Sequence, residues 1–244
     1  MGFWSGVAQF FTTASNWTGS QGILHRLAQH VEVSAISVAV AAAIALPLAL
    51  WLGHRGRGGF LAITVANVGR ALPSFAVLVV GAAWLGIGQK PALLALVVLS
   101  IPPILTNTYT GVSEVDPDQK DAARGMGMTG WQVLRQVEVP AATPLIFAGL
   151  RTATVQCVAT ATLAAYVGYG TLGQFINEGL ANASSGQAEL FCGGLLVVAL
   201  ALVAELGLAG AQRLATPKGL RRQAPAEVLV DDVALAGPLP ERLG

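Results

Sequence analysis

The residues that could do chemistry in this chain lie in a polar stretch between two long apolar runs, at positions 121–140. The stretch begins with the acidic residue Asp121 and two alanines, continues through glycines at 125 and 127, and reaches Pro140 after an apolar run. Glycines allow close backbone approach, and apolar side chains fill a groove on a partner. We therefore interpret this stretch as a docking element for another protein.

Residue types that support catalysis or metal binding are not clustered anywhere in the sequence. The three histidines, His25, His30 and His54, lie at the ends of apolar runs and form no constellation with a nucleophile or a metal ligand. Cys157 and Cys192 both fall inside apolar runs, where the expected state is a small buried hydrophobe. The sequence predicts no catalytic residue and no metal site, and it indicates that the chain is not an enzyme.

A nucleotide-binding motif is also missing from the sequence. The chain has no G-x-x-x-x-G-K-[ST] phosphate loop, so it cannot bind and hydrolyse ATP by that route. The formal net charge is only +1, and no basic cluster accompanies an aromatic platform. We therefore expect no cofactor in this chain and no nucleic-acid partner.

Composition places the chain in a membrane. Hydrophobic residues make up 54% of the sequence and charged residues 11%, with a mean hydropathy of +0.62. A soluble domain carries about 25% charged residues. Apolar runs near the roughly 20 residues that a bilayer requires predict an all-α polytopic protein with five core spans. The predicted spans are 33–52, 60–86, 91–109, 145–167 and 190–208, the second interrupted by Gly69, Arg70 and Pro73.

The remaining segments divide the chain into three parts. Residues 1–21 lack the features of a cleavable signal peptide and predict an amphipathic segment at the external membrane interface, rich in aromatic residues. Residues 22–216 form the predicted transmembrane domain, in which 168–187 is too short and polar to cross and is expected at the surface or partly re-entrant. Residues 217–244 predict a disordered cytoplasmic tail.

The distribution of Arg and Lys sets the predicted topology. If the polar stretch is cytoplasmic, only Arg26 and Lys90 of the basic residues near spans lie outside, which satisfies the positive-inside rule. The amino terminus is then external and the carboxyl terminus cytoplasmic. The basic residues assigned to the inside are Arg55, Arg57, Lys120, Arg124, Arg135, Arg213, Lys218, Arg221 and Arg222.

The polar stretch itself predicts two short helices. Asp116 followed by Pro117 has the pattern of an N-cap with proline at the first helical position, and this helix should end near Gly125 or Gly127. Thr129 and Gln132 have the spacing of a capping box, which opens a second helix, and Pro140 is expected to end it. The residues predicted to form a small apolar surface are Ala122, Ala123, Met126, Trp131, Leu134 and Val137. Taken alone, the pattern also fits an amphipathic helix resting on lipid headgroups.

Several motifs together give this sequence a family resemblance. The stretch resembles the cytoplasmic coupling loop of ATP-binding-cassette (ABC) importer permeases, and residues 22–214 resemble the osmoprotectant branch, which moves glycine betaine, choline and carnitine. The motifs are Gly-Met-Gly-Met-Thr at 125–129, Val-Glu-Val-Pro at 137–140, Ala-Gly-Leu-Arg-Thr-Ala at 148–153, Ala-Thr-Leu-Ala-Ala at 161–165, Gly-Thr-Leu-Gly at 170–173 and Gly-Arg-Ala-Leu-Pro-Ser at 69–74.

The resemblance implies a type I, methionine-permease-like fold and a set of partners. These are two ABC ATPase subunits that bind ATP, a second identical or related permease chain, an external substrate-binding protein and membrane lipid. The residues implied to couple to the ATPase are Asp121, Ala122, Ala123, Gly125, Met126, Gly127, Trp131, Leu134 and Pro140. The family usually has Glu where this chain has Asp121, and smaller residues where it has Tyr166 to Tyr169.

Charged and aromatic residues within the spans are candidates for the pathway or gate. Arg151 and Glu205 both fall in the cytoplasmic half, so a structural ion pair between them is the leading interpretation and gating is the sharper alternative. Tyr166 and Tyr169 offer aromatic faces, which attract quaternary ammonium groups, although packing and anchoring also explain them. The candidate pathway or gate residues are Arg70, Pro73, Arg151, Tyr166 and Tyr169.

Two other functions remain open from the sequence. A permease for methionine or another small solute would share the same loop, although the motifs at 148–153 and 161–165 argue against it. An ion-driven secondary transporter or channel would need internal repeats or a relay of intramembrane carboxylates, and neither pattern is present.

Overall fold

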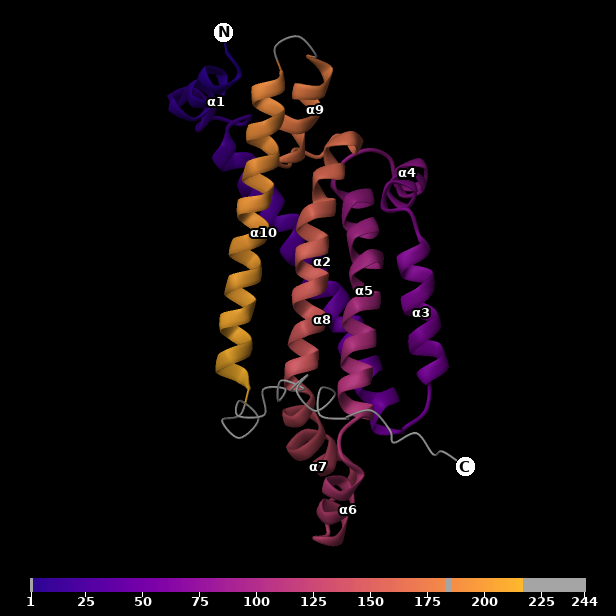
Figure 1. The fold of residues 1–244 in the computed structure, drawn as a ribbon. Helices are drawn as coiled ribbons and strands as arrows, with labels where there is room; N and C mark the ends of the chain where they lie inside the picture. The colour runs from indigo at the N-terminus through magenta and orange to yellow at the C-terminus, as the bar shows by residue number, and fades with distance from the viewer. Residues whose placement is uncertain (1, 183–185, 217–244) are drawn as a thin grey trace, which may run out of the picture.

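The computed structural model describes residues 2–182 and 186–216, apart from the side chains at positions 61, 63 and 70. Within these residues every regular element is a helix, and the long helices run side by side as an elongated bundle (Figure 1). This confirms the predicted all-α class. The predicted disordered tail, 217–244, lies outside the described residues.

Four helices of the described chain are long and apolar enough to cross a membrane by length and composition. The first two are α2 (Ile23–His54) and α5 (Gln89–Ser113). The third is a continuous run formed by α7 (Gly130–Val133), the π-helical turn η2 (Leu134–Glu138), α8 (Val139–Thr160) and the 3-10 helix η3 (Ala161–Val167). The fourth is α10 (Gln187–Ala215). They contain the predicted first, third, fourth and fifth spans.

The predicted second span is interrupted, as the sequence indicated at Gly69, Arg70 and Pro73. It is divided into α3 (Gly59–Ala71) and α4 (Ser74–Leu85), which both pack along α5. Leu72 is extended, with φ −72° and ψ 118°, because the residue before a proline is excluded from the helical region. Pro73 then begins the next helix as its N-cap. Only four of the five predicted spans are therefore uninterrupted helices.

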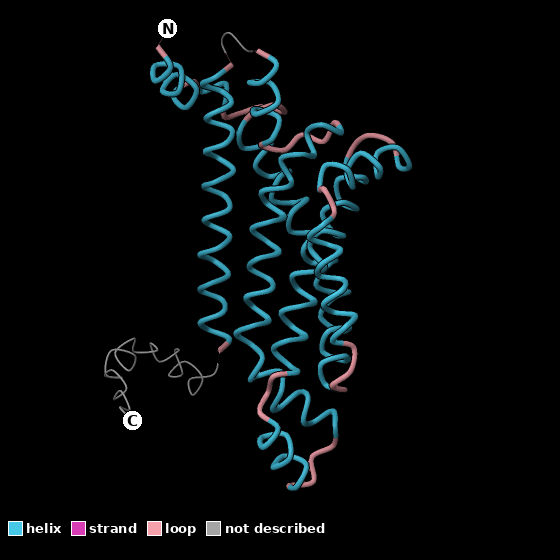
Figure 2. Tube along the Cα trace, turned by 45° about the vertical axis from the view of Figure 1, so that its right-hand side comes forward, coloured by secondary structure: helices cyan, strands magenta, loops and turns pink. Residues whose placement is uncertain are grey.

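The short elements gather at the two ends of the bundle. At one end lie α1 (Phe3–Thr12), the 3-10 turn η1 (Ala14–Asn16) and α9 (Gly173–Ala181). At the other end α6 (Pro117–Gly125) and α7 project beyond the long helices, below the end of α10 (Figures 1 and 2). In the described residues 168–182 and 186 of the segment predicted not to cross, the regular element is the short helix α9.

The amino-terminal segment is folded onto the bundle through aromatic contacts. The ring of Phe3 lies 5.5 Å from that of Phe191 on α10, and the ring of Phe10 lies 5.4 Å from that of Phe175 on α9. The indole Nε1 of Trp17 donates to the carbonyl of Phe11 at 2.8 Å. The short helix α1 is therefore attached to the end of the bundle, and it is too short to be a span.

The core sits between α2, α5 and α8, where small residues let the helices approach closely. Ala41, Ala45 and Ala49 on one face of α2 are fully buried, and they pack in one cluster with residues of α5 and α8. At Gly149 of α8 a Cβ atom would lie 2.9 Å from the Cβ of Asn107, so α5 and α8 meet almost backbone to backbone. Small residues at contacts are the usual device of helix packing in membranes.

Candidate functional site

The predicted docking element comprises α6, α7 and η2, and these residues, 116–138, are here called the coupling element. Asp116 caps α6 by accepting from the backbone N–H of Asp118 at 2.9 Å, and Pro117 occupies the first turn. The helix ends at Gly125, and Gly127 follows with φ +84°, a left-handed conformation that favours glycine. The predicted start and end of the first helix are confirmed.

The second helix starts with the predicted capping box. The Thr129 hydroxyl accepts from the backbone N–H of Gln132 at 3.4 Å, and the Gln132 side-chain oxygen accepts from the backbone N–H of Thr129 at 2.7 Å. Two of the orphan N–H groups at this terminus are therefore satisfied within the element. The sharp reversal between α6 and α7 is set locally by sequence.

The predicted helix end at Pro140 is wrong. Pro140 lies in the first turn of α8, and the helical run continues through it from Gly130 to Val167. The five residues before α8, Leu134–Glu138, form a π-helical turn. Proline is tolerated in a first turn because no N–H group is needed there for a helical hydrogen bond. In the π-helical turn just before it, each backbone hydrogen bond spans five residues instead of four. The coupling element is thus continuous with a span.

The tip of the coupling element (Asp121, Ala122, Gly125, Met126 and Trp131) faces solvent. Met126 is 72% exposed and Trp131 is 68% exposed, so two large apolar side chains of this polar loop are open to solvent. Asp121 and Ala122 are exposed as well, and nothing lies within 4 Å of a Cβ atom built at Gly125. The side chains of the tip are therefore largely open to solvent.

The other four residues of the predicted coupling set contribute to the structure of the element rather than to its tip. Ala123 is 2% exposed, and Leu134 is 8% exposed and packs in a cluster with Val112 and Ala142. Gly127 is the turn residue between the helices, and Pro140 is half-buried at the start of α8. The nine residues thus divide into an exposed tip and a group that builds the element.

A buried carboxylate at the base of the coupling element was missed by the sequence interpretation. The side chain of Glu138 is fully buried, and its Oε2 lies 2.7 Å from Nδ1 of His54 at the end of α2. Its Oε1 lies 3.8 Å from Nζ of Lys120 on α6. The signal was present in Val-Glu-Val-Pro at 137–140, because a charged residue inside an apolar run requires a partner. Only the fold identifies the partners.

The predicted ion pair within the spans is present. A guanidinium nitrogen of Arg151 on α8 contacts the Glu205 carboxylate on α10, and a second nitrogen donates to Gln212 Oε1 at 3.0 Å. Both charged side chains are 32% exposed. They lie at one end of a groove between α8 and α10, whose walls include the exposed polar side chains of Thr152 and Gln156.

The other candidate pathway residues are spread along the bundle. Arg70 lies near the end of α3, with its side chain outside the described part, and Pro73 divides α3 from α4. Tyr166 on η3 is 49% exposed, and its ring meets that of Phe75 on α4 edge-on at 5.7 Å. The structure does not bring these residues and Arg151 together in one site within this chain.

Tyr169 is held near the end of the bundle opposite the coupling element. Its hydroxyl accepts from Nε2 of Gln89 at 3.3 Å, and its ring packs against the cluster around Val33 and Leu78. Burial raises the pKa of the Tyr169 phenol, and the nearby Glu32 carboxylate raises it further. The phenol is therefore neutral at physiological pH and acts here as a packing and hydrogen-bonding group.

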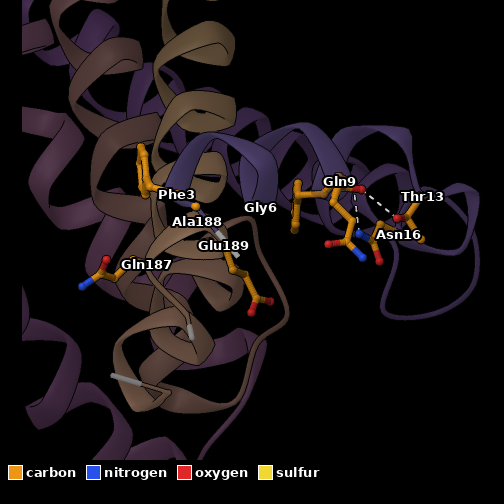
Figure 3. Close-up of a pocket in the computed structure, with 10 residues that line it drawn as sticks. Phe3, Gly6, Gln9, Thr13, Asn16, Gln187, Ala188 and Glu189 are labelled. Atoms are coloured by element: carbon orange, nitrogen blue, oxygen red, sulfur yellow. Dashed lines mark hydrogen bonds between the residues drawn. The ribbon is translucent and has the colours of Figure 1, made fainter. Parts of the chain in front are cut away.

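A pocket at this same end lies between α1 and the start of α10 (Figure 3). Its wall on α1 includes Phe3, Gly6 and Gln9, with the Thr13 hydroxyl just beyond the helix donating to the Gln9 carbonyl at 2.7 Å. Glu189 is the single charged residue among those that line it. The described residues contain no group of three or more potential metal ligands, and Cys157 and Cys192 are buried and not disulfide-bonded.

Curated relatives of this chain are permease proteins. The chain is 38% identical over 205 residues to the glycine betaine/carnitine/choline transport system permease protein OpuCB of Bacillus subtilis, covering 84% of this chain and 93% of the relative. It is 39% identical over 194 residues to the carnitine transport permease protein OpuCB of Listeria monocytogenes, covering 79% and 88%. It is 36% identical to the osmoprotectant import permease protein OsmW of Salmonella typhimurium, covering 79% and 91%.

Solved structures and the family comparison agree with this similarity. The fold matches a chain of the inward-facing MetNI methionine ABC transporter with a TM-score of 0.67 at 22% identity, covering 80% of this chain and 96% of that one. This likeness shows the predicted type I importer permease fold. Residues 45–213, more than half of the sequence, match the model for the binding-protein-dependent transport system inner membrane component. The chain therefore belongs to this family of multi-pass membrane permease subunits, which are transport components rather than enzymes.

Proposed function

We propose that this chain forms half of an ATP-driven import pathway for osmoprotectant quaternary amines such as glycine betaine, choline and carnitine. The observation that carries the proposal is the coupling element, whose exposed apolar tip projects from a bundle of membrane-spanning helices. The substrate class rests on relatives whose names specify these compounds, at 38% and 39% identity over most of their length.

The partner of the tip is proposed to be an ABC ATPase subunit, with two such subunits in the complete importer. Met126 and Trp131 would enter a groove on the ATPase, since large exposed apolar and aromatic side chains are frequent anchors at protein interfaces. Asp121, Ala122 and Gly125 would approach the same groove, whereas Ala123, Gly127, Leu134 and Pro140 would hold the tip in shape from within. ATP would be bound by the ATPase.

The orientation in the inner membrane follows from the same element. With the coupling element in the cytoplasm, Arg55, Arg57 and Arg213 lie at the cytoplasmic end and Lys90 at the external end. The positive-inside rule favours this arrangement. The amino terminus would then be external and the carboxyl terminus cytoplasmic, and the external end would receive substrate from the binding protein.

A second permease chain, identical or related, would complete the pathway. Thr152 and Gln156 leave polar side chains exposed on a spanning helix, which favours a protein partner or a hydrated path over lipid. The pair of Arg151 and Glu205 borders the same groove. Arg70, Pro73, Tyr166 and Tyr169 would contribute to the pathway or gate from other parts of each chain. Surrounding lipid would contact the remaining apolar surface.

Alternating access would follow from differential binding. ATP would favour a closed ATPase pair, the coupling elements would move with it, and the two permease chains would open outward. A ligand shifts such an equilibrium only as far as its affinities for the two states differ. The binding protein and ATP would therefore both prefer the outward-open state of the permease.

The test of this proposal is uptake of radiolabelled glycine betaine and choline into transporter-deficient cells. The cells would express this chain with the ATPase, binding protein and any second permease encoded beside it, and methionine uptake would be the control. We expect saturable quaternary-amine uptake that disappears with an ATPase lacking its catalytic glutamate. Uptake of methionine alone would refute the substrate class, and the absence of ATP-dependent uptake of any of these solutes would refute the function.

The proposed gate has its own test in the ion pair. Arg151→Gln leaves the Glu205 carboxylate without its guanidinium partner, so we expect lower uptake and less assembled complex. The double variant Arg151→Gln with Glu205→Gln removes both charges. Recovery of assembly without recovery of uptake would support a gating role, whereas recovery of both would reduce the pair to a structural contact.

A further inference from the structure

The carboxylate of Glu138 joins segments that are far apart in the sequence. It lies at the last residue of the π-helical turn, where the coupling element becomes the spanning helix α8. Its two oxygens face His54 at the end of α2, at 2.7 Å, and Lys120 on α6, at 3.8 Å. Lys120 also donates to the backbone carbonyl of Val112 on α5 at 3.1 Å. Glu138 therefore contacts the end of α2 directly and is linked to the end of α5 through Lys120.

The charged side chains of this cluster are largely or fully buried, which makes loss of a partner energetically costly. The Glu138 side chain is fully buried, whereas those of His54 and Lys120 are 23% and 15% exposed. An ionised carboxylate only accepts hydrogen bonds, so this contact suits the tautomer of His54 that has its proton on Nδ1. A buried charge that loses a partner is strongly destabilised, which makes the arrangement resistant to distortion.

The surroundings of His54 restrict its movement further. A Cβ atom on Gly130, the first residue of α7, would lie 3.2 Å from Nε2 of His54. The imidazole is therefore in contact with the start of α7 as well as with Glu138. Its own backbone belongs to the last turn of α2. Displacement of α7 relative to α2 must break or carry along this contact.

The position of the cluster matters because α6 and α7 project beyond the long helices (Figures 1 and 2). A force applied at the tip can reach the bundle through the continuous helix into α8 and through the contacts at the base of the element. The helical connection transmits motion of the tip to α8. The contacts of Glu138 with His54 and of Lys120 with Val112 connect the coupling element to α2 and α5 as well, and these two helices pack on each other and on α8.

We propose that Glu138 is a positioning residue that locks the coupling element to α2 and α5, so that motion of the tip moves the three core helices together. This inference rests on the proposed ATP-driven transport. Without the carboxylate, the ATPase would still bind the tip, but its closure would displace the coupling element without displacing α2. Loss of the cluster therefore uncouples ATP hydrolysis from transport.

The first experiment measures the coupling ratio, substrate moved per ATP hydrolysed, with the complete importer in liposomes. Glu138→Gln keeps the shape and removes the charge, and we expect the ratio to fall by about tenfold, within the range of typical coupling free energies. ATPase binding, judged by co-purification, stays at the wild-type level. The matched control is Glu114→Gln, an exposed glutamate just after α5 with no ion pair among the described residues.

His54→Gln provides a second and independent variant, with His25→Gln at the exposed start of α2 as its control. We expect His54→Gln to lower the coupling ratio as well, and the double variant with Glu138→Gln to lose no more than the stronger single change. This non-additivity is the mark of one cluster acting as a unit. If Glu138→Gln fails to assemble, the His54→Gln ratio decides. A wild-type ratio in either assembled variant would overturn the proposal.

A second readout does not depend on the substrate. Spin labels on Gln119→Cys and Arg57→Cys report the distance between α6 and the turn after α2, and both native cysteines are buried. On binding ATP, the unaltered cluster should keep this distance fixed, whereas Glu138→Gln should shift or broaden it. An ATP-dependent shift with Glu138 intact would overturn the proposal. Failure of the wild-type complex to transport quaternary amines would instead refute the proposed substrate while leaving this distance test valid.

Discussion

The tip and the base of the coupling element differ in nearly every physical property, although fewer than 20 residues separate them. At the tip, Met126 and Trp131 are 72% and 68% exposed, and the ion pair of Asp121 and Arg124 is open to solvent. At the base, the Glu138 carboxylate is fully buried. The tip is therefore mostly exposed to solvent, whereas the base contains a buried charge that is paired with other segments.

This difference separates two tasks that one loop must perform. A surface that docks onto a partner gains from apolar side chains that are desolvated only on binding. A surface that passes motion to the bundle gains from contacts that already exist and are costly to break. Substitutions at the tip should therefore change binding and leave folding intact, and substitutions at the base should change folding or transmission.

The largest effect is expected at Gly125. A Cβ atom there would meet nothing within 4 Å, so the chain itself tolerates a side chain, but a docked partner would not. We expect Gly125→Asp to abolish ATP-driven uptake while the chain still inserts in the membrane, measured by uptake and by membrane fractionation. Gly125→Ala is the matched control and should retain most uptake. Normal uptake with Gly125→Asp would remove the tip from the mechanism.

Leu134 tests the base by its packing. The side chain is 8% exposed in a cluster with Val112 and Ala142, so Leu134→Ala should lower the free energy of unfolding by about 3 kcal/mol through the cavity it leaves. Thermal unfolding of the purified permease in detergent gives the measurement. An unchanged midpoint would mean that the base is not packed as described.

Trp131 tests the tip through partner binding rather than through stability. Trp131→Ala should weaken binding of the ATPase by about 2 kcal/mol, the size typical of an interface hot spot, and leave unfolding of the isolated permease unchanged. Trp84→Ala is the control, because Trp84 is 88% exposed at the far end of the bundle. Equal loss of ATPase binding in both variants would show that the tip has no special role.

Thr129 lies between the two regions and should have an intermediate effect. Thr129→Ala removes one half of the capping box and should destabilise the start of α7 by about 1 kcal/mol. Hydrogen exchange should become faster at the backbone amides of α7 and stay the same in α6. Faster exchange throughout the coupling element would mean that the two helices unfold as one cooperative unit. The tip and the base could then not be treated as separate regions.

The smallest effect is expected at Arg124. Its pair with Asp121 spans 3.2 Å between side chains that are 57% and 73% exposed, and such surface pairs contribute between about 0 and 1 kcal/mol. Arg124→Gln should leave the thermal unfolding midpoint of the permease within error. A clear decrease would mean that the pair is shielded from solvent, contrary to its exposure.

The elements that the sequence predicted well are those specified by neighbouring residues. The cap at Asp116 and Pro117 and the capping box at Thr129 involve partners two or three residues away. The positions of four spans follow from apolar length alone. The pair of Arg151 and Glu205 was predictable because an intramembrane charge demands a partner and few candidates exist.

The error at Pro140 arose because a local rule was applied without knowledge of the neighbouring turn. Pro140 suggested a helix end, but its place in a first turn after a π-helical turn lets the helix continue. The interruption of the second span at Pro73 was expected, and the structure shows it as a complete division, with Leu72 extended between α3 and α4.

Composition and motifs were enough to establish that this chain crosses a membrane, has a polar loop of two capped helices between its spans and resembles a known family of permeases. These properties depend on composition and on short motifs. The tertiary structure alone decided which loop residues are exposed and which are buried, and that Glu138 meets His54 and Lys120, which lie 84 and 18 positions earlier in the chain. Contacts between distant residues depend on the packing of α2, α5 and α8, and no local pattern encodes the resulting distances.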